Sequence, residues 1–406
     1  MDGDAREITL GDEQGRASSG YRWLILLLTC SLCFLGNYMQ YQVAAYATVI
    51  MPQMNIDPVG FSSLFLAPML AAVFFSLPFG SLGDRLGPKV VILGGFCVSL
   101  VGGAIRIFNL SNYPAQLVSM FCIGVGMAAL TANNAKTLGL WFADKTDVAM
   151  GIYYAATCFG IAAAQASSAF MPSVLMGYTA AEGLLVVLTI FWGIFGKNVQ
   201  HDSLIPDGVE RDQALLTAFR SRNVWLCAIC AAFSLAATTA FSGVLPQALE
   251  LVRGADASMA GEMAALTTAA GIVGCLIAPI LYGKCRLTRP YLVIVGLLGS
   301  ISIAAAWFAS GLKSMGALLA VCGIVTSMMG PVVQALPVSF AEIGTRYAGS
   351  AGGIMAEVSL LGSCMLPIGI AAISGSDYDK QMMLIALLYG LSVLPALISP
   401  EVKRSK

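Results

Sequence analysis

The chain has 406 residues, of which 58% are hydrophobic and only 11% are charged, and its mean hydropathy is +0.81. Such a small number of polar side chains cannot cover the surface of a soluble globule of this size. The composition therefore excludes a soluble globular protein and indicates an integral membrane protein. The 22 basic and 22 acidic residues balance, which gives no basic face for a nucleic-acid partner.

The first 20 residues differ in composition from the rest of the chain. They carry five acidic and two basic side chains together with several glycines, and they show no apolar periodicity. A signal peptide would begin basic and then turn apolar, which this segment does not. We therefore expect residues 1–20 to be a disordered cytoplasmic tail.

Twelve apolar stretches follow, each long enough to cross a bilayer as a helix. In chain order they are residues 23–51, 61–82, 90–108, 113–142, 149–171, 180–195, 224–251, 259–282, 291–309, 315–340, 348–373 and 381–398. A longer polar connection, residues 196–222, divides them into two sets of six. The sequence predicts an all-α integral membrane protein with two six-helix bundles, residues 21–195 and 223–399, a cytoplasmic linker between them, and a cytoplasmic C-terminal tail, residues 400–406.

The two halves also repeat each other in sequence. Residues 78–86 align with residues 279–287 at an offset of 201, and residues 149–152 align with residues 351–354 at an offset of 202. A third local match lies between them at nearly the same offset. Matches at one period indicate a duplicated six-helix unit, the arrangement in which transporters place a binding site between pseudo-symmetric halves.

The connection between the second and third stretches reads Gly-Ser-Leu-Gly-Asp-Arg-Leu-Gly-Pro-Lys from Gly80 to Lys89. It resembles the loop between helices 2 and 3 of the major facilitator superfamily, whose pattern is roughly G-x-L-x-D-R-x-G-R-K. The matching positions are Gly80, Leu82, Asp84, Arg85, Gly87 and Lys89, whereas Pro88 departs from the pattern. The resemblance implies twelve helices in two bundles that expose a central site to each side of the membrane in turn.

This loop predicts a conformational latch. We expect Asp84 to approach the positive N-terminus of the eleventh span near Ala348, and Arg85 to meet Asp144 or Asp147 after the fourth span. Gly87 permits the positive φ angle that such a tight turn requires. In the second repeat Cys285 stands in place of Asp84, so we expect only the first copy of the loop to act as a latch.

Charged residues inside the spans are candidates for solute binding. Lys136 lies about six residues, roughly 9 Å of helix, inside the end of the fourth span, and Glu357 lies near the middle of the eleventh. A charge at such depth costs about 2.5–3.5 kcal/mol, so it normally faces a wet cavity or a partner. We predict that Lys136 holds an anionic group and that Glu357 takes up a proton or a cation. The alternative is a structural charge paired within a bundle. Arg106, at the end of the third span, has a structural role if its side chain snorkels to the interface.

The resemblance implies that spans 1, 4, 7 and 10 line a central cavity. Polar and aromatic residues predicted to bind solute there or on the fifth span are Gln40, Tyr41, Asn133, Tyr154 and Gln334, the last of which aligns with Lys136 in the repeat. Such side chains can equally form hydrogen bonds between helices.

The basic residues predict the orientation. With both termini in the cytoplasm, 17 of the 22 Lys and Arg residues fall in the tails and the loops on that side, which indicates a multi-pass protein of the cell membrane.

Residues 134–142, Asn-Ala-Lys-Thr-Leu-Gly-Leu-Trp-Phe, are similar to a pattern of anion-carrying branches of the superfamily. We predict a monomeric secondary active transporter, not an enzyme, that moves a small organic, carboxylate-like, or inorganic anion by rocker-switch alternating access. We expect no cofactor and no metal, and as partners only the solute and the lipid bilayer. Transport would be coupled to proton symport if Glu357 titrates. The alternatives are a carrier of an amphipathic or cationic solute that uses Glu357, and a non-transporting sensor on the same scaffold.

Overall fold

The structure is a computed structural model, and it describes residues 2–56, 58–143, 145–171, 173–198, 213–255, 257–285, 287–345, 347–375 and 377–401. The regular secondary structure within these ranges is helical throughout, and 12 helices are long and apolar enough to cross a membrane. The predicted all-α membrane fold with twelve transmembrane helices is therefore confirmed.

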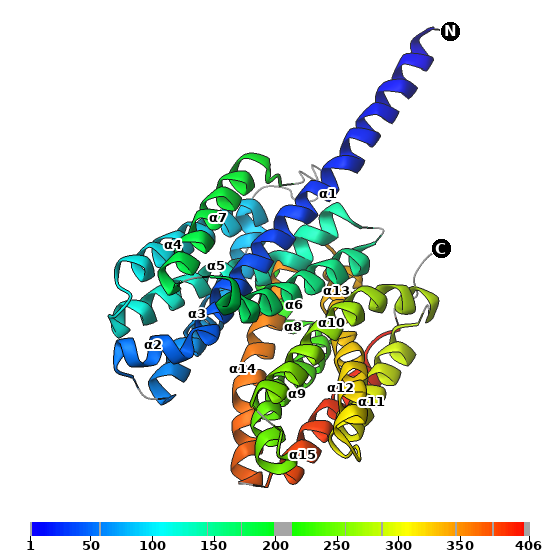
Figure 1. Cartoon of the computed structure of the whole chain (residues 1–406). Coiled ribbons are helices and arrows are strands. Elements are labelled where there is room, and N and C mark those ends of the chain that lie inside the picture. Colours follow the sequence, from blue (N-terminus) through cyan, green and yellow to red (C-terminus); the bar gives the residue numbers. More distant parts are fainter. Residues whose placement is uncertain are drawn as a thin grey trace.

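The first half of the chain forms one bundle, drawn in blue to green in Figure 1. Its helices are α1 (Asp2–Ala45), α2 (Ala47–Met54), α3 (Pro58–Leu86), α4 (Pro88–Phe108), α5 (Tyr113–Trp141), α6 (Thr146–Phe170) and α7 (Val174–Phe195). Their apolar faces meet in one large buried core that contains almost only side chains from this half.

The second half forms the other bundle, drawn in green to red in Figure 1, after the short helix α8 (Gln213–Arg220). Its elements are α9 (Arg222–Arg253), α10 (Ala257–Cys285), α11 (Thr288–Trp307), α12 (Leu312–Ser327), α13 (Met329–Ala335), the 3-10 turn η1 (Leu336–Ser339), α14 (Ala348–Ser374), α15 (Tyr378–Leu391) and α16 (Val393–Ile398). The tenth span is thus built from α12, α13 and η1, and the twelfth from α15 and α16.

The N-terminal segment differs from the disordered tail predicted for residues 1–20. Helix α1 begins at Asp2, and its first part projects away from both bundles (Figure 1). An existing helix gains one hydrogen bond for each residue added and needs no new nucleus, so the first span can continue outward through a polar segment.

The two bundles touch along two matching lines, α14 against α3 and α5, and α6 against α10 and α13. Glycines make both contacts close: a Cβ atom at Gly353 would lie 2.8 Å from the Ser76 carbonyl oxygen of α3, and one at Gly151 would lie 2.6 Å from the Cys275 carbonyl oxygen of α10. Gly151 and Gly353 are aligned positions of the sequence repeat. The packing between the bundles therefore follows the same pseudo-twofold relation as the sequence.

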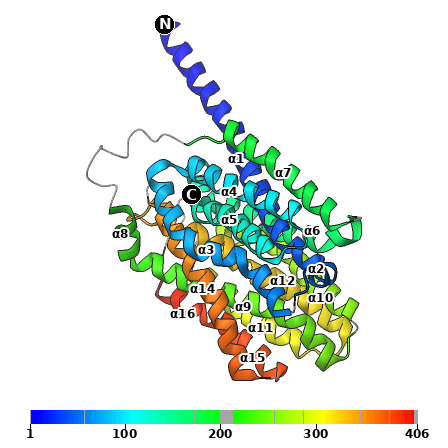
Figure 2. The same cartoon turned by 90° about the vertical axis from the view of Figure 1, so that its left-hand side faces the viewer.

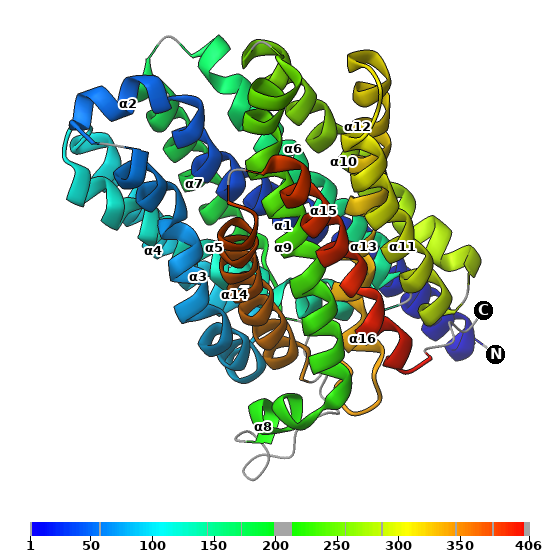
Figure 3. The same cartoon turned by 90° about the horizontal axis from the view of Figure 1, so that it is seen from below.

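The bundles lie close together at one face and diverge at the other. Figures 1 and 2 show the first-half helices running to one side and the second-half helices to another, away from the region of the two chain ends. Seen from below in Figure 3, α14 lies between α9 and the pair α3 and α5, in agreement with their contacts. We call the face nearest the chain ends the terminal face.

Candidate functional site

Asp84, in the last turn of α3, joins the two bundles at the terminal face. Its Oδ1 atom accepts a hydrogen bond from the Gly349 amide at 3.0 Å, and its Oδ2 atom accepts one from the Ser350 amide at 2.6 Å and another from the Ser350 hydroxyl group. Only 2% of the Asp84 side chain is exposed. The first amides of α14 have no partner within their own helix, so a carboxylate here satisfies them and meets the positive end of the helix dipole. The contact expected for Asp84 is present.

Lys136 lies in the same cluster. Its Nζ atom is 2.7 Å from Asp84 Oδ1 and donates a second hydrogen bond to the Gly83 carbonyl oxygen at 3.0 Å. The side chain is 9% exposed, so the ammonium group is enclosed in an ion pair within the first bundle. The anionic group that Lys136 holds in this structure is thus a protein carboxylate at the terminal face.

The pairing of Lys136 with Asp84 depends on a close contact at Gly83, which the sequence alone does not show. A Cβ atom at Gly83 would lie 1.6 Å from Asn133 Oδ1, so only glycine lets α3 and α5 approach closely enough for Lys136 to reach Asp84. Asn133 itself donates to the carbonyl oxygens of Phe79 and Ala129, each at 3.0 Å, and is fully buried. In this structure Asn133 ties α5 to α3 and does not face the space between the bundles.

The turn after α3 is held by Gly87 and Asn198. Gly87 has φ +85°, in the left-handed region that favours glycine. The Asn198 side chain accepts from the Lys89 amide at 3.0 Å and donates to the Leu86 carbonyl oxygen at 3.4 Å. The pairing predicted between Arg85 and Asp144 or Asp147 stays a prediction: Asp144 lies outside the described residues, and Asp147, in the first turn of α6, is buried.

Tyr154 and Gln334 come from opposite bundles. Tyr154 of α6 lies against α13, and Gln334 of α13 lies on the side of its helix that faces α6. A Cβ atom at Gly330 of α13 would lie 3.4 Å from Tyr154 Cε1 of α6. Gln334 is one helical turn beyond Gly330 on the same face of α13, so it also points toward the first bundle. These two predicted solute-binding residues therefore lie on the surface between the bundles.

Glu357 lies on the same side of α14 as the two glycines that pack against α3. Gly349, Gly353 and Glu357 are spaced four residues apart, and the two glycines contact the Asp84 side chain and the α3 backbone respectively. Glu357 is half-buried, and among the described residues no hydrogen bond or ion pair reaches its carboxyl group. A carboxyl group thus stands on the inter-bundle face where the close glycine contact ends.

Gln40 and Tyr41 of α1 both contact Phe65 of α3. Gln40 is 3% exposed and donates through Nε2 to the Phe65 carbonyl oxygen at 3.4 Å. The Tyr41 ring meets the Phe65 ring edge to face, with 5.2 Å between the ring centroids. Gln40 therefore already has a partner inside the first bundle, and the Tyr41 ring is paired with the Phe65 ring.

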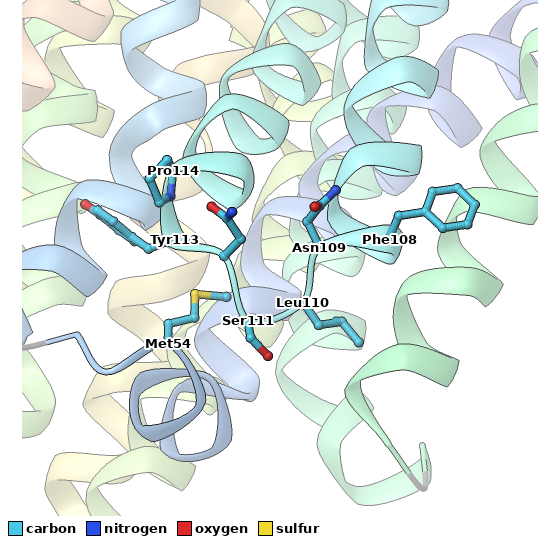
Figure 4. A pocket seen from close by; sticks show the side chains of 8 residues that line it. Met54, Phe108, Asn109, Leu110, Ser111, Tyr113 and Pro114 are labelled. Carbon is cyan, nitrogen blue, oxygen red and sulfur yellow. The ribbon is translucent and has the colours of Figure 1, made fainter.

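A depression of about 670 Å³ lies apart from these residues (Figure 4). It is lined by Met54 of α2 and by residues 108–114 between α4 and α5. No charged side chain lines it, and it opens on the connection away from the terminal face. It offers nothing that would orient a charged solute.

Glu342, in the turn before α14, is linked to the start of α9. It accepts hydrogen bonds from Asn223 Nδ2 at 2.7 Å and from Ser221 Oγ at 3.0 Å. Burial acts to raise the pKa of Glu342, but hydrogen bonds from the backbone, Asn223 and Ser221 outweigh it, so the pKa lies below its ordinary value of 4.5.

A group with a lowered pKa stabilises the folded state above its unfolded pKa, and this stabilisation is lost as the pH falls through the folded pKa. We therefore expect Glu342→Gln to lower the unfolding temperature at pH 7 and to have no effect in strong acid. The side chain is exposed, so screening keeps the effect below about 1 kcal/mol. Thermal unfolding of both proteins across the acid range measures it, and a difference that persists at the lowest pH would contradict the assignment.

The comparisons with known proteins agree on the fold. The model of the Major Facilitator Superfamily matches residues 26–367. The 4-hydroxybenzoate transporter PcaK of Pseudomonas putida is 29% identical over 120 residues, which cover 30% of this chain and 26% of PcaK. The agnestins efflux protein AgnL12 of Paecilomyces divaricatus is 25% identical over 135 residues, 33% of this chain and 30% of AgnL12. The matches thus span less than a third of either relative.

Two solved structures are similar over almost their whole length. The Escherichia coli fucose:proton symporter FucP, as the N162A variant, has a TM-score of 0.74 and 17% identity, and the match covers 95% of this chain and 99% of that one. FucP in the outward conformation has a TM-score of 0.75 and 16% identity over 95% and 100% of the two chains. At this level of identity the likeness concerns the fold alone.

Proposed function

Because the chain belongs to the Major Facilitator Superfamily, and is therefore a multi-pass membrane transporter and not an enzyme, we propose that it carries a small carboxylate-like organic anion by rocker-switch movement of its two bundles. The observation that carries the mechanism is the attachment of Asp84 to the first turn of α14, made while the opposite ends of the bundles diverge. A solute would enter between the diverging ends, and release of this attachment would open the terminal face.

The proposed solute site is the inter-bundle surface that carries Tyr154, Gln334 and Glu357, and we propose Tyr41 of α1 as a further contact. Aromatic and amide groups suit a flat organic acid, since rings stack and amides hydrogen-bond to a carboxylate. The name of the relative PcaK, a 4-hydroxybenzoate transporter, supports an aromatic carboxylate as the first solute to test.

Proton symport follows from the charges in this proposal. Lys136 is already paired with Asp84, so it gives the solute no free cation in this state. Two carboxylates in one site do not both ionise, so a carboxylate solute beside Glu357 would share a proton with it. We propose that this proton crosses with the solute and that both termini lie in the cytoplasm of a protein of the cell membrane.

We expect proteoliposomes containing the protein to accumulate labelled 4-hydroxybenzoate when a proton gradient is imposed. Glu357→Gln should lower this accumulation at least tenfold while exchange of internal for external solute continues. Glutamine still donates a hydrogen bond, but it has no proton that it can release and take up. Glu262→Gln, which changes an exposed glutamate of α10, is the matched control and should transport normally. Full gradient-driven accumulation by Glu357→Gln would contradict the role of this residue.

A second candidate is a carrier of cationic or amphipathic solutes that uses Glu357 as a counter-charge. It is favoured by the lack of any hydrogen bond or ion pair at this half-buried carboxyl group among the described residues. Uptake of organic cations that compete with one another, with no uptake of any tested anion, would establish this candidate in place of the first.

A further inference from the structure

A buried cluster of polar side chains lies inside the first bundle, where α1, α4 and α7 meet. Its centre is Arg106, in the last turn of α4, which is 0% exposed and so does not snorkel to the membrane surface as its position in the sequence suggests. Its Nη1 atom donates to the Met39 carbonyl oxygen of α1 at 3.3 Å, and its guanidinium carbon lies 4.1 Å from the centroid of the Tyr178 ring of α7. A cation is therefore held within the bundle by a carbonyl group and a ring face.

Close backbone packing brings the other members to Arg106. A Cβ atom at Gly103, one turn before Arg106, would lie 1.5 Å from Glu182 Oε2, so the Glu182 carboxyl group of α7 rests on α4. Tyr178 is one turn before Glu182 on α7. Gln42 of α1 and Tyr46, which lies between α1 and α2, reach Gly177, where an added Cβ atom would lie 2.7 Å from Gln42 Nε2 and 2.9 Å from the Tyr46 hydroxyl oxygen.

Several polar atoms in this cluster have no hydrogen-bond partner among the described residues. The unpartnered buried atoms are Arg106 Nε, Arg106 Nη2, Gln42 Oε1, the Tyr178 hydroxyl oxygen and Glu182 Oε2. Buried polar atoms are nearly always satisfied, and where the protein offers no partner, water or an ion does so. Because donors and acceptors are mixed, and the arginine and glutamate charges oppose each other, the set suits water and a proton better than a metal cation or a free anion.

Glu182 is the group of the cluster that can change its charge. Arginine stays protonated in proteins. The charged or titratable groups that face the pair are Tyr178 on α7, Tyr38 on α1 and Tyr46 between α1 and α2, and the phenols gain no negative charge near neutral pH. No ion pair within 4.0 Å joins Glu182 to Arg106, and the two groups interact only through their charges at a longer distance.

We propose that Glu182 and Arg106 form a hydrated proton-binding site inside the first bundle, in which the Glu182 carboxyl group takes up and releases a proton and Arg106 is its fixed counter-charge. The inference goes beyond the proposed function, since it holds for whichever solute the carrier binds and concerns a carboxyl group other than Glu357. When Glu182 is ionised it attracts the guanidinium group toward α7, and when it is neutral Arg106 bonds to the Met39 carbonyl oxygen alone. Met39 precedes Gln40 and Tyr41, so the state of the proton is transmitted to helix α1.

Infrared difference spectroscopy of the purified protein between mildly basic and mildly acidic buffer tests the site directly, because a protonated carboxyl group out of bulk water has its own carbonyl band. We expect Glu182→Gln to remove one titrating band that Glu357→Gln leaves intact. Arg106→Gln should move the midpoint of that band upward by about one to three pH units, the effect of losing an opposite charge nearby, whereas Arg106→Lys should shift it less. The spectra need no solute, so failure of this site and failure of the proposed transport are separate results.

Thermal unfolding shows first whether each variant is folded. Should Arg106→Gln not fold, Arg106→Lys and Tyr178→Phe serve in its place, since both keep the volume of the site while changing a group that faces the carboxyl. A midpoint that moves in either variant supports the proposal. An unchanged band in folded Glu182→Gln, or a midpoint that no Arg106 or Tyr178 variant moves, overturns it.

Discussion

Replacing Asp84 by asparagine is expected to release the terminal face of the protein. The carboxylate accepts three hydrogen bonds from Gly349 and Ser350 and pairs with Lys136, all with 2% of its side chain exposed. Asparagine keeps one acceptor oxygen but removes the negative charge that neutralises the buried ammonium group of Lys136. Removing one partner of a buried ion pair typically costs about 3–5 kcal/mol.

Hydrogen exchange measures this effect where it occurs. In Asp84→Asn the amides of the first turn of α14 should exchange at least a hundredfold faster than in the unchanged protein, while the interior of α4 exchanges as before. A hundredfold increase in the exchange rate across both bundles would mean general unfolding and would contradict a local latch.

A double-mutant cycle separates the ion pair from the rest of the latch. Lys136→Met removes the cation but leaves Asp84 bonded to Gly349 and Ser350, so its cost should be smaller than that of Asp84→Asn. The double variant should cost less than the two single variants together, because neither leaves an unpaired charge when the other is gone. Strict additivity of the unfolding free energies would show that the pair contributes nothing to the latch.

Gly80→Ala is expected to prevent closure of the terminal face by steric means alone. A Cβ atom at Gly80 would lie 2.4 Å from the Gly349 carbonyl oxygen, a backbone atom that cannot rotate away. The bundles must then separate at α3 and α14, and Asp84 loses the amides of α14 without any change of charge. Gradient-driven solute uptake should fall at least tenfold.

The control for this substitution is another glycine of α14, the helix that Gly80 contacts. Gly369 of α14 has nothing within 4 Å of an added Cβ atom, so Gly369→Ala should transport as the unchanged protein does. Alanine is also the better helix former, so neither substitution weakens its helix. Equal transport by the two alanine variants would contradict a close approach at Gly80.

The twelve spans and the pairing of halves followed from the sequence because both leave periodic signals. Hydropathy marks each span wherever it is long enough to cross the bilayer, and the duplicated unit places Gly151 and Gly353 at equivalent contacts. The approach of Asp84 to the start of α14 was also predictable, since a carboxylate next to a helix N-terminus is favoured by its orphan amides.

The partners of Lys136 and Arg106 could not be predicted in the same way. Depth in the membrane indicated that Lys136 needs a partner, but the choice of Asp84 depends on the approach of α3 to α5, which Gly83 permits. Arg106 near a helix end suggested a side chain at the surface, yet α1 and α7 enclose it. Distances between helices are set by packing of residues far apart in the chain, and no local pattern encodes them.

The replacement of Asp84 by Cys285 in the second repeat makes the two contacts between the bundles chemically different. This face is closed by two seams, one between α3 and α14 and one between α6 and α10. The first seam is fastened by a carboxylate, whereas the second ends at a thiol, which forms no charge-assisted bond. The pseudo-twofold relation therefore holds for the close packing of the bundles, whereas the contact of the Asp84 carboxylate with a helix N-terminus has no equivalent at Cys285.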